Sequence, residues 1–194
     1  MVGLNDIITS RVRVKLLELF FSDVNEIYHV RGIVREIKEE INAVRLNLER
    51  LEKAGVLKKE TRSNRVYYWP RPDYPFFEDI LSMVAKTTGL GAKIIENKRK
   101  IGNIAWVMFS GRFARRLERK KEDEIDILVV GDIILPELAA LIRYEEANRN
   151  REINYTVMSR EEFEFRKKRR DPFLLGILAS TRVMIIGDEE RLVG

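Results

Sequence analysis

The chain has 194 residues, of which 45% are hydrophobic and 35% are charged, and its formal net charge is +5. This composition excludes a disordered chain, and the absence of Cys excludes disulfides, thiolate zinc sites and cysteine nucleophiles. The single His excludes a His-pair metal site and leaves little room for a Ser-His-Asp triad.

The cellular location is expected from what the sequence lacks. No apolar run approaches the roughly 18 residues of a membrane-spanning helix, and the N-terminus has no long apolar stretch of the signal-peptide kind. We therefore expect a cytoplasmic protein with no membrane partner. Its 36 Lys and Arg residues against 31 Asp and Glu residues are compatible with a polyanionic partner.

The first half of the sequence predicts three helices followed by a hairpin. Apolar residues recur with helical spacing in three segments, residues 5–21, 28–38 and 41–54. Gly55 stands where a C-terminal helix stop belongs. Two short strands are predicted next, at residues 56–60 and 65–69, around a polar turn at residues 61–64.

A proline-rich segment separates the two halves. Pro70, Pro72 and Pro75 fall within six residues, a density that neither a helix nor a central strand accepts. We expect an N-terminal domain over residues 1–70, a linker and connecting helix over 71–91, and a C-terminal domain over 92–194.

The second half alternates helices and strands. Helices are predicted at residues 76–88, 92–101, 135–149, 160–170 and 172–179, with a short basic helix after residue 109. Strands are predicted at residues 103–109, 125–130, 152–158 and 182–186. Such interleaving is typical of a mixed α/β sheet, which we expect in the C-terminal domain. Together with the helices and hairpin of the first half, it makes the expected fold class of the chain α+β with two domains.

The first candidate site is the third helix with its hairpin. Three helices and a hairpin in about 65 residues form the layout of a winged helix-turn-helix, in which the third helix enters the major groove of DNA. Asn can pair with adenine and Arg with guanine, whereas Arg residues in the hairpin are placed to contact phosphates. The predicted DNA-binding residues are Asn42, Arg45, Asn47 and Arg50 on the outer face of the helix, and Arg62 and Arg65 in the hairpin.

The run LERLEKAGVL before a short basic hairpin resembles the ArsR-type family of winged-helix transcription regulators, over roughly residues 5–70. The resemblance implies binding of double-stranded DNA, and we expect a homodimer because helix-turn-helix dimers read two half-sites. Metal sensing does not carry over, since the chain has no Cys and one His. Residues 1–70 carry only 13 basic against 10 acidic residues, and protein binding is the alternative for this unit.

The second candidate site lies in the run VMFSGRFARRLERKKEDEIDILVV, residues 107–130. The small Ser110-Gly111 turn would let backbone N–H groups approach a phosphate. Strand alternation would put Glu124 and Asp126 on one face, where two carboxylates can hold Mg²⁺ ions that bridge nucleotide phosphates. These two residues are the catalytic and metal-binding candidates.

The same run resembles the minimal nucleotidyltransferase family of the DNA polymerase beta type, over about residues 95–186. By position, the family's Gly-Ser pair falls on Ser110-Gly111 in swapped order, and its Asp-x-Asp pair falls on Glu124 and Asp126. Its third carboxylate falls on Asn154, although Glu152 could substitute. These departures favour a fold retained with its chemistry lost, because a displaced or neutral ligand weakens both metal binding and catalysis.

Basic residues surround the second site. Residues 98–121 hold nine Lys and Arg residues and one acid, which predicts a phosphate-binding surface. The residues assigned to phosphate binding are Ser110, Gly111, Arg112, Arg115 and Arg116. The alternative is an exposed segment that the acidic residues 122–126 balance.

Together these features favour a DNA-binding transcriptional regulator. Its nucleotidyltransferase-like domain would serve as a sensor, a partner platform or a phosphate-binding surface, with no cofactor assigned. The alternative is an active nucleotidyltransferase that uses Mg²⁺ and a nucleoside triphosphate to modify a protein or RNA. As a sub-variant, that resemblance implies the antitoxin of a toxin–antitoxin pair, with a small helical toxin-like partner. A protein-interaction module without nucleic-acid binding is a third hypothesis.

Overall fold

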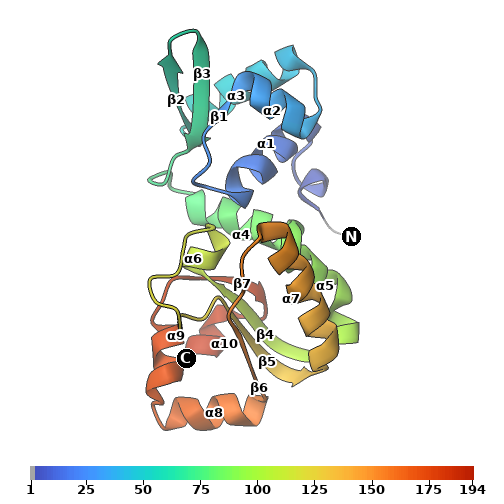
Figure 1. Ribbon diagram of the computed structural model, residues 1–194, viewed down its shortest axis with the longest axis vertical. Helices are drawn as coiled ribbons and strands as arrows, with labels where there is room; N and C mark the ends of the chain where they lie inside the picture. The colour runs from blue at the N-terminus through green and yellow to red at the C-terminus, as the bar shows by residue number, and fades with distance from the viewer. Residues whose placement is uncertain (1–2) are drawn as a thin grey trace. The chain divides into compact units, whose positions relative to one another are not determined.

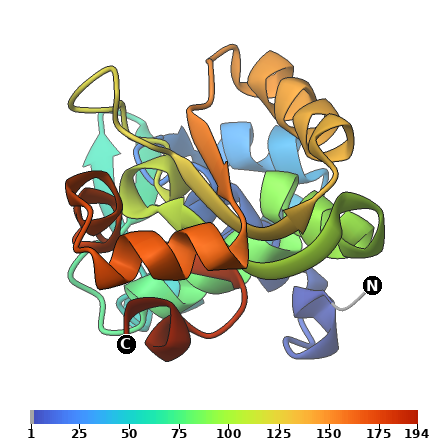
Figure 2. The same ribbon diagram turned by 90° about the horizontal axis from the view of Figure 1, so that it is seen from below.

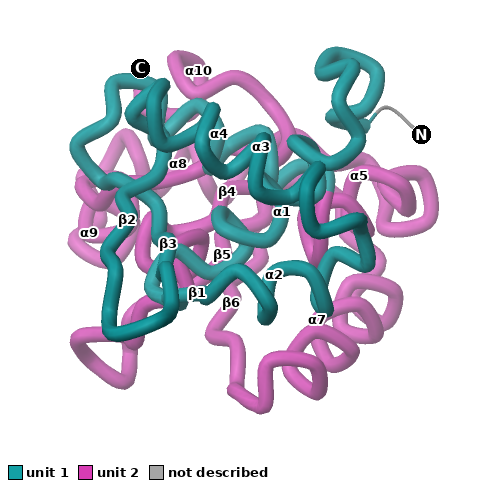
Figure 3. Tube along the Cα trace, turned by 90° about the horizontal axis from the view of Figure 1, so that it is seen from above, with its two compact units in different colours: residues 1–87 teal, residues 88–194 magenta. Residues whose placement is uncertain are grey.

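The computed structural model describes residues 3–194. The described chain has an α+β fold with ten α-helices and two sheets. It divides into two compact units, of which unit 1 ends at Thr87 and unit 2 begins at Thr88 (Figures 1 and 3). The division falls inside the segment 71–91, because the helix that follows the prolines packs within unit 1.

Unit 1 contains the expected helices and hairpin together with elements that the sequence did not reveal. Its elements are η1 (Leu4–Asp6), α1 (Arg11–Ser22), β1 (Tyr28–His29), α2 (Val30–Ile37), α3 (Ile41–Lys53), β2 (Leu57–Arg62), β3 (Arg65–Pro70) and α4 (Phe77–Thr87). The helix expected from residue 5 begins only at Arg11, where the Ser10 side chain accepts a hydrogen bond from the Arg13 N–H. The hairpin turn is tighter than expected, with only residues 63–64 between the strands.

The helices of unit 1 pack around a small antiparallel sheet with the strand order β1-β3-β2. Phe20, Ile33 and Leu48 come from three different helices and have no exposed surface. The Phe21 and Phe77 rings, 5.2 Å apart between centroids, join α4 to α1. The core therefore fixes which face of each helix points outward.

Unit 2 contains the expected alternation of helices and strands. Its elements are α5 (Gly89–Ile101), β4 (Gly102–Ser110), α6 (Gly111–Ala114), β5 (Ile127–Ile133), α7 (Leu135–Arg149), β6 (Tyr155–Met158), α8 (Arg160–Lys168), α9 (Pro172–Leu178), β7 (Arg182–Ile186) and α10 (Glu189–Val193). Helix α10 was not predicted from the sequence, since it has five residues and buries one apolar side chain, Leu192.

The sheet of unit 2 has the strand order β6-β5-β4-β7, in which only β5 and β6 run parallel. Helices α8, α9 and α10 contribute to the core on one face, whereas α5 and α7 pack together on the other (Figures 1 and 2). Residues 127–130 of β5 are consequently fully buried, as expected for a strand covered on both faces.

No helix in the described part of the chain combines the length and the apolar character that crossing a membrane requires.

Candidate functional site

Helix α3 presents a polar face that is held by its N-terminal cap. Glu40 precedes the helix, and its Oε2 accepts hydrogen bonds from the N–H groups of Asn42 and Ala43 at 2.8 and 2.9 Å. This capping keeps the pKa of Glu40 below its usual value. The exposed side chains of α3 include Asn42, Arg45, Leu46, Glu49 and Arg50.

Asn47 does not belong to this face, and the expectation that it would lie on the outside is wrong. Its exposure is only 6%. Its Nδ2 donates to the Ala43 carbonyl at 2.9 Å, and its Oδ1 accepts from the Ser10 hydroxyl at 3.4 Å. Asn47 therefore ties α3 to the start of α1, and it lies one helical position from the apolar Leu48 that is also buried.

Two side chains on the outer face of α3 were not singled out from the sequence. Leu46 is 48% exposed, and an apolar side chain on such a face can contact the methyl group of thymine. Glu49 is exposed beside Arg45 and Arg50, and a carboxylate can accept a hydrogen bond from cytosine. If Asn47 is placed on the inner face of α3, the helical period places Leu46 and Glu49 on the outer face. The period is therefore the signal that could have identified them.

The hairpin carries its basic residues at the turn. Arg62 and Arg65 face each other as the last cross-strand pair, and both are exposed. The Arg62 guanidinium donates twice to Glu60 Oε2, at 2.8 and 3.0 Å, and it lies over the Tyr67 ring. This pairing raises the pKa of Arg62 and fixes the direction of its side chain.

In unit 2 the two carboxylates proposed as metal ligands do not share a strand face. Strand β5 begins at Ile127, so Glu124 and Asp126 lie in the segment before it, and the expected strand alternation is wrong there. Glu124 Oε2 accepts from the Lys120 N–H at 2.7 Å and lies 3.9 Å from Arg112 Nε. Asp126 is bound instead to groups from the 119 and 151–154 regions.

Asp126 is buried among arginines. Its side chain is 1% exposed, and its Oδ2 accepts from Arg119 Nη1 at 3.2 Å and from the Asn154 N–H at 3.0 Å. Its Oδ1 has no hydrogen-bond donor in the described chain, although Arg151 Nη2 lies 3.8 Å away. Burial raises the pKa of Asp126, while the Asn154 N–H and the two arginines oppose that rise. The guanidinium groups of Arg119 and Arg151 are therefore the positive charges beside this carboxylate.

Asn154, the position assigned to a third carboxylate, holds the segment 115–126. Its Nδ2 donates to the carbonyl oxygens of Glu122 and Glu124 at 2.6 and 3.3 Å. Arg151 Nη1 donates to the Leu117 carbonyl at 2.9 Å, and Arg119 Nη2 donates in the other direction, to the Glu152 carbonyl at 3.4 Å. An amide can donate the two bonds of Asn154 whereas a carboxylate cannot. Asn therefore has a structural role at this position, to which the resemblance assigns a carboxylate.

The Ser110-Gly111 turn uses its backbone N–H groups inside the protein. Ser110 donates to the Asp126 carbonyl at 2.8 Å, and Gly111 donates to the Thr181 carbonyl at 2.7 Å. The Ser110 side chain caps α6 by accepting from the Phe113 N–H at 3.2 Å. A Cβ at Gly111 would lie 2.2 Å from Thr181 Oγ1, so this glycine is required by packing. These two N–H groups therefore face carbonyl oxygens and are not directed at a phosphate.

The predicted phosphate-binding arginines also bind the backbone of their own segment. Arg112 donates to the Glu118 carbonyl, and Arg115 Nη1 donates to the Gly111 carbonyl at 3.0 Å. Arg116 is exposed and has a positive φ of 55°. The contacts of Arg112 and Arg115 shape the segment after α6.

The basic run of residues 98–121 does not form one surface. Lys98, Arg99 and Lys100 end helix α5, before β4, whereas the other basic residues follow β4. A nine-residue strand separates the two groups by roughly 30 Å at about 3.4 Å per residue. Counting charges along the sequence grouped together basic residues that strand β4 separates in space.

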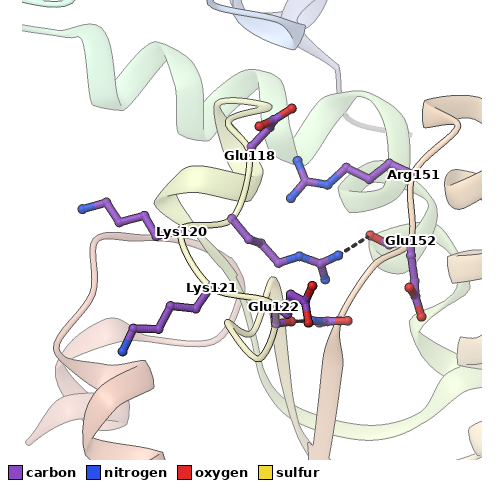
Figure 4. Close-up of a pocket in the computed structure, with 8 residues that line it drawn as sticks. Glu118, Lys120, Lys121, Glu122, Arg151 and Glu152 are labelled. Carbon is purple, nitrogen blue, oxygen red and sulfur yellow. Dashed lines mark hydrogen bonds between the residues drawn. The ribbon is translucent and has the colours of Figure 1, made fainter.

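A cavity of about 570 Å³ lies beside the Asp126 cluster. Its walls come from residues 118–122 and from Arg151, Glu152 and Asn154 (Figure 4). Arg151 extends toward the centre of this view, whereas Lys120 and Lys121 point to the opposite side from Glu152. Four basic and three acidic side chains line the cavity, so its charge is nearly balanced.

Within residues 3–194, no group of three or more His, Cys, Asp and Glu side chains is arranged to hold a metal ion. Comparisons with models of protein families, with curated proteins and with solved structures found no match for this chain.

Proposed function

We propose that unit 1 is a winged helix that binds double-stranded DNA, and that the protein is a transcriptional regulator. The order of elements supports this proposal, since α1, β1, α2, α3 and a hairpin follow each other and the sheet has the order β1-β3-β2. In a winged helix, the helix before the hairpin enters the major groove and the hairpin reaches the backbone.

The observation that carries the proposal is the composition of the outer face of α3. Asn42, Arg45 and Glu49 follow each other at spacings of three and four residues, so they share one exposed face. All three are side-chain types that hydrogen-bond to base edges. Arg45 and Arg50 are both exposed, and Arg45 lies close enough to Glu40 to help lower the pKa of that carboxyl. Their guanidinium groups are therefore accessible to DNA.

For unit 2 we propose a non-catalytic role. In support, the three positions that the nucleotidyltransferase resemblance assigns to metal ligands all make internal contacts: Glu124 binds a backbone N–H, Asp126 faces arginines, and Asn154 holds two carbonyl groups. The turn assigned to phosphate binding has its N–H groups paired in the same way. Incubation with labelled nucleoside triphosphates and Mg²⁺ tests this role, and label transfer that Asp126→Ala abolishes would contradict it.

Salt-dependent binding tests the DNA proposal. A labelled duplex from the DNA upstream of the protein's own reading frame is titrated with the full chain at several salt concentrations, using fluorescence anisotropy. Arg65→Ala is expected to weaken every duplex alike and to reduce the slope of log K against log salt by about 0.9, the value for one lost phosphate contact. Arg62→Ala is expected to act in the same direction.

Arg143→Ala, at an exposed position of α7 in unit 2, provides the matched control and is expected to leave the slope unchanged. Failure of the full chain to bind any upstream duplex at low salt would refute the proposal. The same titration also reports assembly, because a homodimer reading two half-sites would bind as two chains per duplex.

A further inference from the structure

A second cavity of unit 2, of about 420 Å³, lies between α9 and the segment before β5. We call it the α9 pocket. Its helical wall includes Phe173, Gly176 and Ile177, which lie three and four residues apart and so share one face of α9, and Ser180 follows the end of the helix. The opposite wall includes Lys120 and Lys121. A cavity of this size is within the range of small-molecule sites.

Gly176 lines the pocket at an exposed position of α9. It lies inside helix α9 with no positive φ, so its conformation does not require glycine, and glycine costs a helix about 1 kcal/mol relative to alanine. A Cβ built at this position would meet no atom within 4 Å. A side chain at this exposed position would therefore stand in the open mouth of the cavity without meeting the opposite wall.

The apolar residues that line the α9 pocket suit an apolar part of a ligand. Phe173 is 43% exposed although it is a large aromatic residue, and it stands beside Pro172 at the start of the helix. Ile177 and Ile125, from the two walls, pack against the core of this face of the sheet. An aromatic or branched aliphatic group placed here would cover apolar surface that now faces water.

The rim of the pocket suits an anionic group. Lys120 and Lys121 are exposed, form no ion pair with a described residue, and point away from Arg151 and Glu152 (Figure 4). Of the two acids at the rim, Glu124 is already bound to the Lys120 N–H and lies near Arg112. With Glu124 paired to Arg112, Asp123 is the acid of the lining that remains to offset the two ammonium groups.

We propose that the α9 pocket binds a small amphipathic anion, a molecule with an aromatic or branched aliphatic body and a single carboxylate or sulfonate-like group. The body lies against Phe173 and the open space at Gly176, and the anionic group contacts Lys120 and Lys121. This site belongs to unit 2, whereas the proposed DNA-binding residues belong to unit 1. Its test does not depend on DNA binding.

The test uses 1-anilinonaphthalene-8-sulfonate as the probe and N-phenyl-1-naphthylamine as its uncharged counterpart, both titrated into the full chain. We expect saturable binding of one sulfonate probe per chain. Gly176→Leu is expected to abolish binding of both probes because its side chain would occupy the mouth of the pocket. The double change Lys120→Ala and Lys121→Ala is expected to weaken the sulfonate probe about fivefold or more and to leave the uncharged probe within twofold.

Two controls keep the outcome decisive. Lys98→Ala with Lys100→Ala removes two exposed lysines from the end of α5 and is expected to change neither affinity. Phe173→Ala, which shortens the wall without filling the pocket, is expected to weaken both probes if Gly176→Leu fails to fold. Equal binding to wild type and Gly176→Leu, with native fluorescence of Trp106, would overturn the proposal. Displacement of the probe by ATP would overturn the assigned ligand class.

Discussion

Replacing Asn154 by Asp would restore the carboxylate of the nucleotidyltransferase pattern, and the structure predicts that this change destabilises unit 2. The wild-type side chain donates to two carbonyl oxygens, at 2.6 and 3.3 Å. A carboxylate cannot donate, and it would face both carbonyl groups with a negative charge. At about 0.5–1.5 kcal/mol for each lost hydrogen bond, and with the added repulsion, we expect a loss of about 2–3 kcal/mol in the free energy of unfolding.

The assay is urea unfolding followed by the fluorescence of Trp106 in a Trp69→Phe background, because the two tryptophans lie in different units. At an m value of about 2 kcal/mol per M of urea, a loss of about 2–3 kcal/mol lowers the midpoint of unfolding by roughly 1–1.5 M. Asn148→Asp, at an exposed position of α7, makes the same chemical change and is expected to cost less than about 0.5 kcal/mol. If Asn154→Asp is as stable as this control, the role assigned to Asn154 is wrong.

Three further predictions concern other residues. Asn47→Ala should destabilise unit 1 by about 1–2 kcal/mol, because it removes a buried hydrogen-bonding side chain; a change in DNA affinity without a change in stability would contradict its inward placement. Gly176→Ala should raise the unfolding free energy of unit 2 by about 0.5–1 kcal/mol, and a loss in thermal melts would show that the site lacks room. The Arg71 guanidinium lowers the pKa of Asp73 from 3.8 to about 2, so its contribution to stability is present above pH 3.8 and is lost as the pH falls toward 2. Asp73→Asn should flatten that part of the acid unfolding curve reported by Trp69 in a Trp106→Phe background, and an unchanged curve would exclude this pairing as a cause.

The sequence was sufficient for most of the regular elements. Helix α3 shows why, since its aliphatic residues repeat at helical spacing and Gly55 follows it, so period and stop signal agree. Strand β5 could be predicted as buried because four apolar residues run without interruption. Short elements were missed, and the two-residue strand β1 exists only through its pairing with β3.

The site residues were harder to predict because their roles depend on distant partners. Asn47 looks like an exposed polar residue until Ser10, 37 positions earlier, provides its hydrogen bond. Asp126 looks like a metal ligand until Arg119 and Arg151 are seen beside it. Local charge was also misleading for residues 98–121, because a strand divides the basic run. Period and composition report neighbours along the chain, whereas these roles come from contacts across the fold.

The most direct measurement of the central claim is the specificity of DNA binding by the full chain and by Arg45→Ala. The affinity for the upstream duplex is compared with that for a scrambled duplex of the same composition at one salt concentration. We expect wild type to prefer the upstream duplex and Arg45→Ala to lose about 1–3 kcal/mol of that preference while retaining its affinity for the scrambled duplex. An unchanged preference in Arg45→Ala would contradict the assignment of α3 as the element that contacts the bases.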